Sequence, residues 1–183
     1  MIVLVTGASS SGKSAIAEEI AVRLSNGKQL YYIATMHAYG EEGAARVDRH
    51  RKKREGKNFI TMEKYRDVHT VETEADATCL LECMSNLVAN EMYDDDRAED
   101  VANEGLAAKI AGNVFELAGR IKNLVIVTNE VFSDGCQYDS ECVKYIEILG
   151  RINQELAGKS DVVIESVVGI PIVLKGDKMY EIV

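Results

Sequence analysis

The stretch that decides the fold lies at the start of the sequence, where residues 2–14 read IVLVTGASSSGKS. Ile2–Thr6 is a short, mainly apolar run rich in β-branched residues, which is typical of a buried strand. Residues 7–14 match the pattern GxxxxGK[ST], and Lys13–Leu24 carries apolar residues at helical spacing. A strand, a glycine-rich loop and a helix in this order predict a phosphate-binding loop.

The residues of this loop have separate chemical roles. Gly7 and Gly12 permit the backbone angles and the close approach with which amide N–H groups surround a phosphate. We expect Lys13 to act as a catalytic residue on the β- and γ-phosphates of ATP or GTP, and the Ser14 hydroxyl to bind Mg²⁺. The predicted nucleotide-binding residues of the loop are Gly7, Ala8, Ser9, Ser10, Ser11, Gly12, Lys13 and Ser14.

Further apolar runs alternate with helical patterns along the chain. The expected strands are 30–34, 59–62, 78–81, 124–128 and 161–168, the expected helices are 41–54, 84–93, 107–121 and 141–157, and a closing hairpin is expected from 170–174 and 179–182. Apolar strands between helices are typical of a mainly parallel sheet that is covered on both faces. With no repeat and no interdomain linker, the sequence predicts one α/β domain of the P-loop NTPase class over residues 1–183.

Composition narrows the function classes. The net charge of −9 argues against nucleic acid as a partner, because its phosphates would be repelled. No stretch approaches the roughly 20 apolar residues that a membrane helix needs, and the first residues do not resemble a signal peptide. The cysteines form no CxxC pair, so we expect free core thiols in a reducing cytoplasm. They are Cys79, Cys83, Cys136 and Cys142.

P-loop chemistry also needs an acid that binds the metal or orients a nucleophile. Glu82 ends the run TCLLE, and Glu130 follows LVIVTN. Open α/β sheets bind their ligands at the carboxyl ends of the strands, so either carboxylate is a candidate. The sequence favours Glu82 modestly and leaves a solvated acid open for both positions.

A basic segment stands out in this acidic chain: residues 46–57 carry seven Lys or Arg against two acids. On a helix, Arg46, His50 and Arg54 would share one face, so that two guanidinium groups flank the imidazole. Neighbouring cations disfavour imidazolium, so His50 would be neutral and able to attack an α-phosphorus. Charge alone does not decide between this catalytic histidine and a solvated basic helix or a nucleic-acid patch.

The sequence resembles the bifunctional adenosylcobinamide kinase/adenosylcobinamide-phosphate guanylyltransferase family of cobalamin synthesis. The resemblance rests on the order and spacing of blocks that run nearly end to end. These blocks are VTGASSSGKS at 5–14, YIAT at 32–35, AARVDRHRKKR at 44–54, TME at 61–63, LLEC at 80–83, VTNEV at 127–131, GRINQELA at 150–157 and VVGIP at 167–171.

This resemblance implies a RecA-like fold, a homotrimer and two reactions. The family phosphorylates the aminopropanol hydroxyl of adenosylcobinamide with ATP or GTP, and then transfers GMP from GTP to that phosphate with release of pyrophosphate. The histidine that carries GMP in the family matches His50. Outside the loop, the family's nucleotide contacts match Ala34, Thr35, Met36, Arg51, Lys52, Lys53, Arg54, Glu63 and Glu82.

One segment departs from the family. After Val131 the family continues with a glycine-rich turn that contains proline, whereas residues 132–138 here read FSDGCQY. The resemblance therefore leaves corrinoid contacts open at this loop. Three alternatives remain beside the bifunctional enzyme: a P-loop kinase of a small metabolite without nucleotidyl transfer, a P-loop switch without turnover, and a nucleic-acid binder with a basic helix.

Overall fold

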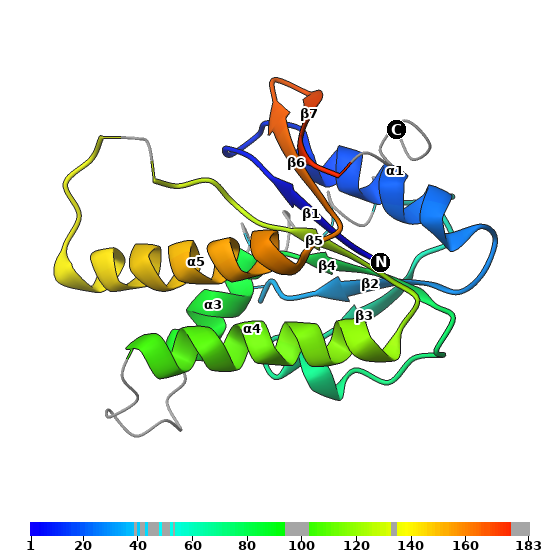
Figure 1. Cartoon of the computed structure of the whole chain (residues 1–183), viewed down its shortest axis with the longest axis horizontal. Helices are drawn as coiled ribbons and strands as arrows, with labels where there is room; N and C mark the ends of the chain where they lie inside the picture. The colour runs from blue at the N-terminus through cyan, green and yellow to red at the C-terminus, as the bar shows by residue number, and fades with distance from the viewer. Residues whose placement is uncertain are drawn as a thin grey trace.

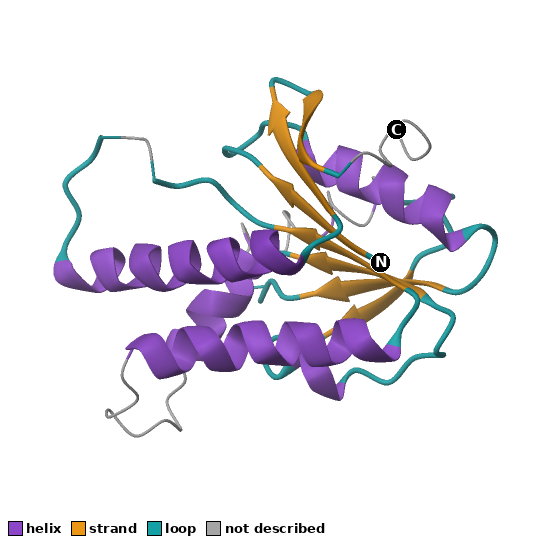
Figure 2. Ribbon diagram, in the orientation of Figure 1, coloured by secondary structure: helices purple, strands orange, loops and turns teal. Residues whose placement is uncertain are grey.

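The computed structural model describes residues 1–38, 40, 43, 48, 52, 54–93, 103–132 and 135–176. Within them, seven strands form one sheet in the order β3-β2-β4-β5-β1-β6-β7 (Figures 1 and 2). The strands are β1 (Ile2–Thr6), β2 (Leu30–Ala34), β3 (Ile60–Glu63), β4 (Thr78–Glu82), β5 (Asn123–Val127), β6 (Val162–Val167) and β7 (Ile170–Lys175). The first six run parallel, and only β7 is antiparallel to its neighbour.

Helices cover both faces of the sheet, as the apolar strands predict. On one face lies α1 (Lys13–Ser25), and on the other lie α3 (Met84–Met92), α4 (Asn103–Arg120) and α5 (Ser140–Lys159). A 3₁₀ turn, η1 (Val68–Thr70), packs against α4. Successive strand residues alternate between the two cores: Val3 and Val5 face α1, whereas Leu4 faces the three-helix layer. The predicted mainly parallel α/β fold is therefore confirmed.

The order of the strands positions the site. β5 lies between β1, which leads into the glycine-rich loop, and β4, which ends in Glu82. Pairs such as Leu4–Ile126 and Leu81–Ile126 hold the three strands in one register. The carboxyl ends of parallel strands lie at the same edge of a sheet. The residues that follow β1, β4 and β5 are therefore brought together at that edge.

The strand expected at 170–174 is present as β7. It pairs with β6 across a turn at Val168 and Gly169, a hairpin that the sequence did not predict. Residues 179–182, the other half of the expected closing hairpin, lie outside the described residues. Both turn residues have positive φ, 46° and 83°, as a two-residue hairpin turn requires. A β-branched residue rarely adopts such an angle. The sequence therefore gave no sign of a turn at Val168, and it predicted a turn at Lys175-Gly176-Asp177.

The cysteine prediction is correct in part. All four thiols are free, but only Cys79 and Cys83 lie in or against the core, while Cys136 is exposed. No helix in the described part of the chain combines the length and apolarity that crossing a membrane requires.

Candidate active site at the phosphate-binding loop

The loop between β1 and α1 is shaped by its two glycines. Gly12 caps α1 with a φ of 94°. At Gly7, a Cβ atom would lie 2.7 Å from the Ser166 carbonyl oxygen, so only glycine fits between the loop and β6. The loop is also tied to the β6–β7 hairpin, since Gly169 N and Ser166 Oγ each donate to the Ser11 carbonyl oxygen at 2.7 Å.

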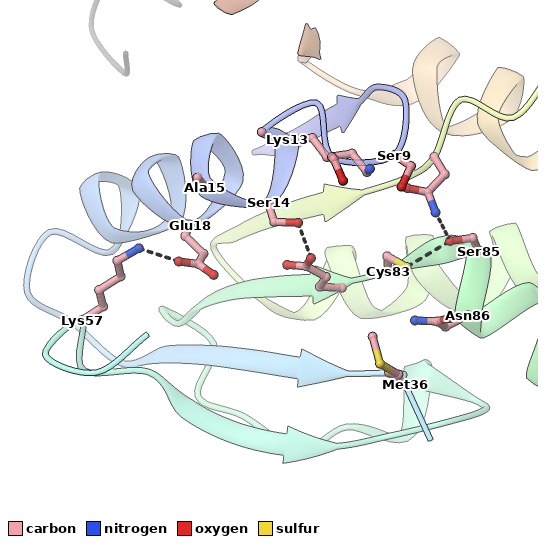
Figure 3. A pocket seen from close by; sticks show the side chains of 14 residues that line it. Ser9, Lys13, Ser14, Ala15, Glu18, Met36, Lys57, Cys83, Ser85 and Asn86 are labelled. Carbon is pink, nitrogen blue, oxygen red and sulfur yellow. Dashed lines mark hydrogen bonds and ion pairs between the residues drawn. The ribbon is translucent and has the colours of Figure 1, made fainter. Parts of the chain in front are cut away.

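A cleft of about 750 Å³ opens beside this loop (Figure 3). Lys57 and Glu18 lie at one end of the view, Ser85 and Asn86 at the other, and Ser14 lies between them. The described residues that line the cleft are Ser9, Ser10, Gly12, Lys13, Ser14, Ala15, Glu18, Met36, Lys57, Glu82, Cys83, Ser85, Asn86 and Asn129. We call Lys13, Ser14 and Glu82 its phosphate end, and Ser85, Asn86 and Asn129 its amide end.

The phosphate end joins the start of α1 to the end of β4. Ser14 Oγ donates to Glu82 Oε1 at 2.5 Å, although 68 residues separate them in sequence. Lys13 Nζ is folded onto the loop and donates to the Ala8 carbonyl oxygen at 3.0 Å. The lysine and the two side-chain oxygens thus stand together where the loop would hold a triphosphate.

Burial dominates the electrostatics of this end. It raises the pKa of the Glu82 carboxyl, while Ser14, Arg54 and Lys13 oppose the rise by stabilising the carboxylate. It also lowers the pKa of Lys13, against the opposing attraction of Cys83 and Glu82. Glu82 Oε2 has no hydrogen-bond partner among the described residues. An orphaned, buried carboxylate oxygen beside a serine hydroxyl suits a hard cation.

These oxygens fit Mg²⁺ in the form that nucleotide enzymes use. In the described part of the chain, no group of three or more His, Cys, Asp and Glu side chains converges to hold a metal. Mg²⁺ commonly needs only one or two protein oxygens, because phosphate oxygens and water complete its octahedron. Ser14 and Glu82 can supply those two.

The geometry separates the two acids that the sequence left open. The Glu82 carboxylate faces Ser14 in the cleft. Glu130 is not among the described residues that line the cleft; its backbone N–H donates to the Gly7 carbonyl, and its carboxylate accepts from Phe132 N at 2.8 Å. Glu130 therefore stabilises the loop after β5, and Glu82 is the better candidate for the metal.

The other predicted nucleotide contacts are only partly brought together. Met36 lines the cleft. Thr35 is buried, and its hydroxyl both accepts from Cys83 N and donates to Cys83 O, so that it joins the ends of β2 and β4. Ala34 ends β2 and is only partly buried, and Glu63 at the end of β3 is exposed and accepts from the Tyr65 hydroxyl.

Of the basic segment, residues 46–57, the structure describes Asp48, Lys52 and residues 54–57. Lys52 is exposed, whereas Arg54 is only 7% exposed and lies with its guanidinium 3.5 Å above the centre of the Tyr32 ring. Arg54 Nη1 has no hydrogen-bond partner in the described part of the chain. His50, Arg51 and Lys53, together with Arg46, lie outside the described residues.

Sequence reasoning missed the other cleft residues. Lys57 forms an ion pair with buried Glu18 at 2.5 Å, which attaches the end of the basic segment to α1. Asn129 directly follows the predicted strand LVIVT, and its place at a strand end could have singled it out. Ser85 and Asn86 carry no such signal, because they are ordinary residues in the first turn of α3.

Comparison with known proteins agrees with these observations. The sequence pattern of the family described as cobinamide kinase / cobinamide phosphate guanyltransferase matches residues 3–174. The bifunctional adenosylcobalamin biosynthesis protein CobU of Escherichia coli (strain K12) is 30% identical, with 96% of this chain and 100% of that protein covered. The protein of the same name from Salmonella typhimurium is 31% identical with the same coverage, and CobP of Pseudomonas aeruginosa is 30% identical over 96% and 98%.

Among solved structures, the flagellar accessory protein FlaH from Methanocaldococcus jannaschii gives a TM-score of 0.48 at 17% identity, covering 96% of this chain and 78% of that chain. That likeness is too weak to bear on function. The match of the family pattern over residues 3–174 is decisive, because it includes the glycine-rich loop, the basic segment and Glu82. The chain belongs to the cobinamide kinase / cobinamide phosphate guanyltransferase family.

Proposed function

We propose that this chain catalyses both reactions of its family. It first transfers the γ-phosphoryl group of ATP or GTP to the hydroxyl of adenosylcobinamide, and then transfers GMP from GTP to the resulting phosphate. The products are adenosylcobinamide-GDP and pyrophosphate. The observation that supports this most strongly is the phosphate end, where Lys13 and the hydrogen-bonded pair Ser14–Glu82 meet, in a chain that matches the family over residues 3–174.

The kinase step uses the phosphate end of the cleft. The acceptor oxygen forms a bond to the γ-phosphorus while the bridging oxygen of the β-phosphate leaves, and the hydroxyl proton passes to water. Lys13 would move from the Ala8 carbonyl oxygen to the phosphates, and the loop amides would bind the rest of the triphosphate. Mg²⁺, held by Ser14 and Glu82, would neutralise phosphate charge.

The guanylyl step needs a nucleophile, for which we propose His50. A ring nitrogen attacks the α-phosphorus of GTP, the bond to the β-phosphate oxygen breaks, and pyrophosphate leaves. An oxygen of the acceptor phosphate then displaces the histidine from GMP, which regenerates the free imidazole. The support lies in the sequence, since seven Lys or Arg within residues 46–57 can neutralise the triphosphate beside this histidine.

Two described cations place the end of the basic segment near the cleft. Lys57 lines it, and Arg54 lies close enough to Glu82 to oppose the rise of its pKa. We propose that Arg51, Lys52, Lys53 and Arg54, with Ala34, Thr35, Met36 and Glu63, complete the nucleotide site. Thr35 would act through its bonds to Cys83, because its side chain is fully buried.

We further propose that the enzyme is a cytoplasmic homotrimer, as the resemblance implies. The exposed apolar side chains of the β6–β7 hairpin support self-association: Val168 is 84% exposed, Ile170 61% and Leu174 58%. An apolar edge strand of this kind is commonly covered by another chain. Sedimentation equilibrium should give three times the chain mass of 20.1 kDa, and a monomer would refute this part of the proposal.

Labelling tests the proposed nucleophile. Incubation with GTP labelled at the α-phosphate should leave GMP on the protein in an acid-labile, base-stable bond, as expected of a phosphoramidate. His50→Ala should lose the label completely while it still phosphorylates adenosylcobinamide, because direct transfer to a hydroxyl needs no histidine. The alternative, a P-loop kinase without nucleotidyl transfer, predicts no label on the unaltered protein. A label that survives in His50→Ala would exclude His50 as the carrier.

A further inference from the structure

The amide end of the cleft is built from two neighbouring strand ends. Ser85 and Asn86 lie in the first turn of α3, directly after β4, and Asn129 follows β5. Asn129 Nδ2 donates to Ser85 Oγ at 2.5 Å, and Cys83 Sγ lies 3.0 Å from the same hydroxyl. Figure 3 shows Ser85 and Asn86 on the side of the cleft opposite to Lys57, beyond Ser14.

Side chains of helix α5 form hydrogen bonds to the backbone of the amide end. The Tyr145 hydroxyl donates to the Ser85 carbonyl oxygen at 3.2 Å, and Asn153 Nδ2 donates to the Asn129 carbonyl oxygen at 3.4 Å. Thr128 Oγ1 in turn donates to Asn153 Oδ1 at 2.7 Å. These bonds hold the backbone of Ser85 and Asn129 in place, so their side chains project from fixed positions, which is typical of a binding site.

The same end keeps polar groups available. In the part of the chain that the structure describes, Asn129 Oδ1 and the Asn86 carboxamide make no hydrogen bond, and both residues line the cleft. An amide oxygen can accept from a hydroxyl, and a carboxamide can pair with another carboxamide. These groups therefore face the cleft with hydrogen-bonding capacity still unused.

The distribution of charge indicates which ligand suits this end. The charged side chains among the described residues of the cleft are Lys13, Glu18, Lys57 and Glu82. Ser85, Asn86 and Asn129 are neutral, and so are Cys83 and Met36 beside them. A phosphate group would be bound best by cations, whereas the hydroxyl and amide groups of a ligand need only neutral donors and acceptors.

We propose that the amide end is the acceptor subsite, which binds an alcohol that carries carboxamide groups and no phosphate. Asn129 Oδ1 accepts a hydrogen bond from the acceptor hydroxyl and orients its oxygen toward the γ-phosphate, Asn86 pairs with a neighbouring carboxamide, and Ser85 holds the Asn129 side chain in place. This inference rests on the proposed kinase reaction and assigns the residues that recognise its second substrate.

Asn129→Ala tests the subsite in the full chain. The variant should lower kcat/KM for phosphorylation of adenosylcobinamide on the order of tenfold, through the loss of a neutral hydrogen bond and of orientation. Binding of a non-hydrolysable ATP analogue, and GMP labelling in the absence of acceptor, should stay unchanged, because neither involves the acceptor. Ser85→Ala should give a smaller loss in the same assay, and Asn86→Ala should raise KM for the acceptor rather than lower kcat.

Asn113→Ala on α4 is the matched control, since that carboxamide contacts Asp67 and is not among the described residues that line the cleft. It should change no rate. Unchanged phosphorylation in both Asn129→Ala and Ser85→Ala would overturn the subsite, and so would an equal loss of nucleotide binding in Asn129→Ala. If the unaltered protein fails to phosphorylate adenosylcobinamide, the proposed function itself fails and the subsite with it. The variants are compared only with an active parent, so the two failures are distinguishable.

Discussion

The two ends of the cleft differ in how the chain builds them. The phosphate end is largely local, because Lys13 and Ser14 are adjacent at the start of α1 and only Glu82 comes from elsewhere. The amide end is assembled by the topology, which places the ends of β4 and β5 side by side and holds them with α5. The first works through charge and the second through neutral hydrogen bonds. The proposed assignment therefore divides nucleotide chemistry and acceptor recognition between the two ends of one cleft.

The largest expected effect is at the phosphate end. Lys13→Ala should lower the rates of both reactions on the order of a thousandfold, because the lysine neutralises phosphate charge that develops in the transition state. Steady-state assays of phosphorylation and of guanylyl transfer measure this, with circular dichroism as the control for folding. Unchanged turnover would refute the role of the loop.

A smaller loss is expected at Glu82. Glu82→Gln keeps the shape but removes the charge, so it should lower phosphorylation on the order of a hundredfold. If Mg²⁺ is held there, raising its concentration should recover part of the loss. A rate and a Mg²⁺ dependence equal to those of the parent would show that Glu82 holds no metal.

The raised pKa of Glu82 also predicts opposite effects on activity and stability. Burial favours the protonated form in the folded protein, so the folded pKa lies above the unfolded one. Protonated Glu82 therefore contributes to the stability of the folded protein. This contribution is fully present at pH values below the unfolded pKa, and it is lost as the pH rises through the folded pKa. Without nucleotide and Mg²⁺, Glu82→Gln should lose this dependence and be more stable than the parent above that pH. Urea unfolding across pH measures it, and identical profiles would contradict the account.

The smallest effect tests the support from α5. Burial raises the pKa of Tyr145 to about 12, so its hydroxyl remains a donor to the Ser85 carbonyl at physiological pH. Tyr145→Phe should raise KM for the acceptor by about threefold and leave nucleotide binding unchanged, in keeping with one weak neutral hydrogen bond. Tyr93→Phe, at an exposed position, is the matched control. A change in nucleotide affinity would mean that the two ends are not separate.

The same contrast explains what the sequence could predict. The strand Leu30–Ala34 and the loop after β1 follow from local patterns, because short apolar and aromatic runs and glycine spacing act within a few residues. The pairing of Ser14 with Glu82 needed the strand order, which the sequence only suggested by placing Glu82 at a strand end. Asn129, Ser85 and Asn86 could not be assigned, since asparagine and serine after a strand are common and their meeting depends on tertiary packing. The turn at Val168 was missed because its φ of 46° is rare for valine.

The central claim is that one cleft serves both transfers to one acceptor. The most direct measurement is product analysis after the unaltered protein is incubated with adenosylcobinamide, Mg²⁺ and GTP labelled either at the γ- or at the α-phosphate. The account predicts that γ-label appears first in a phosphorylated corrinoid, and that α-label then appears in a GDP-linked corrinoid together with free pyrophosphate. Hydrolysis of GTP without label on any corrinoid would contradict it.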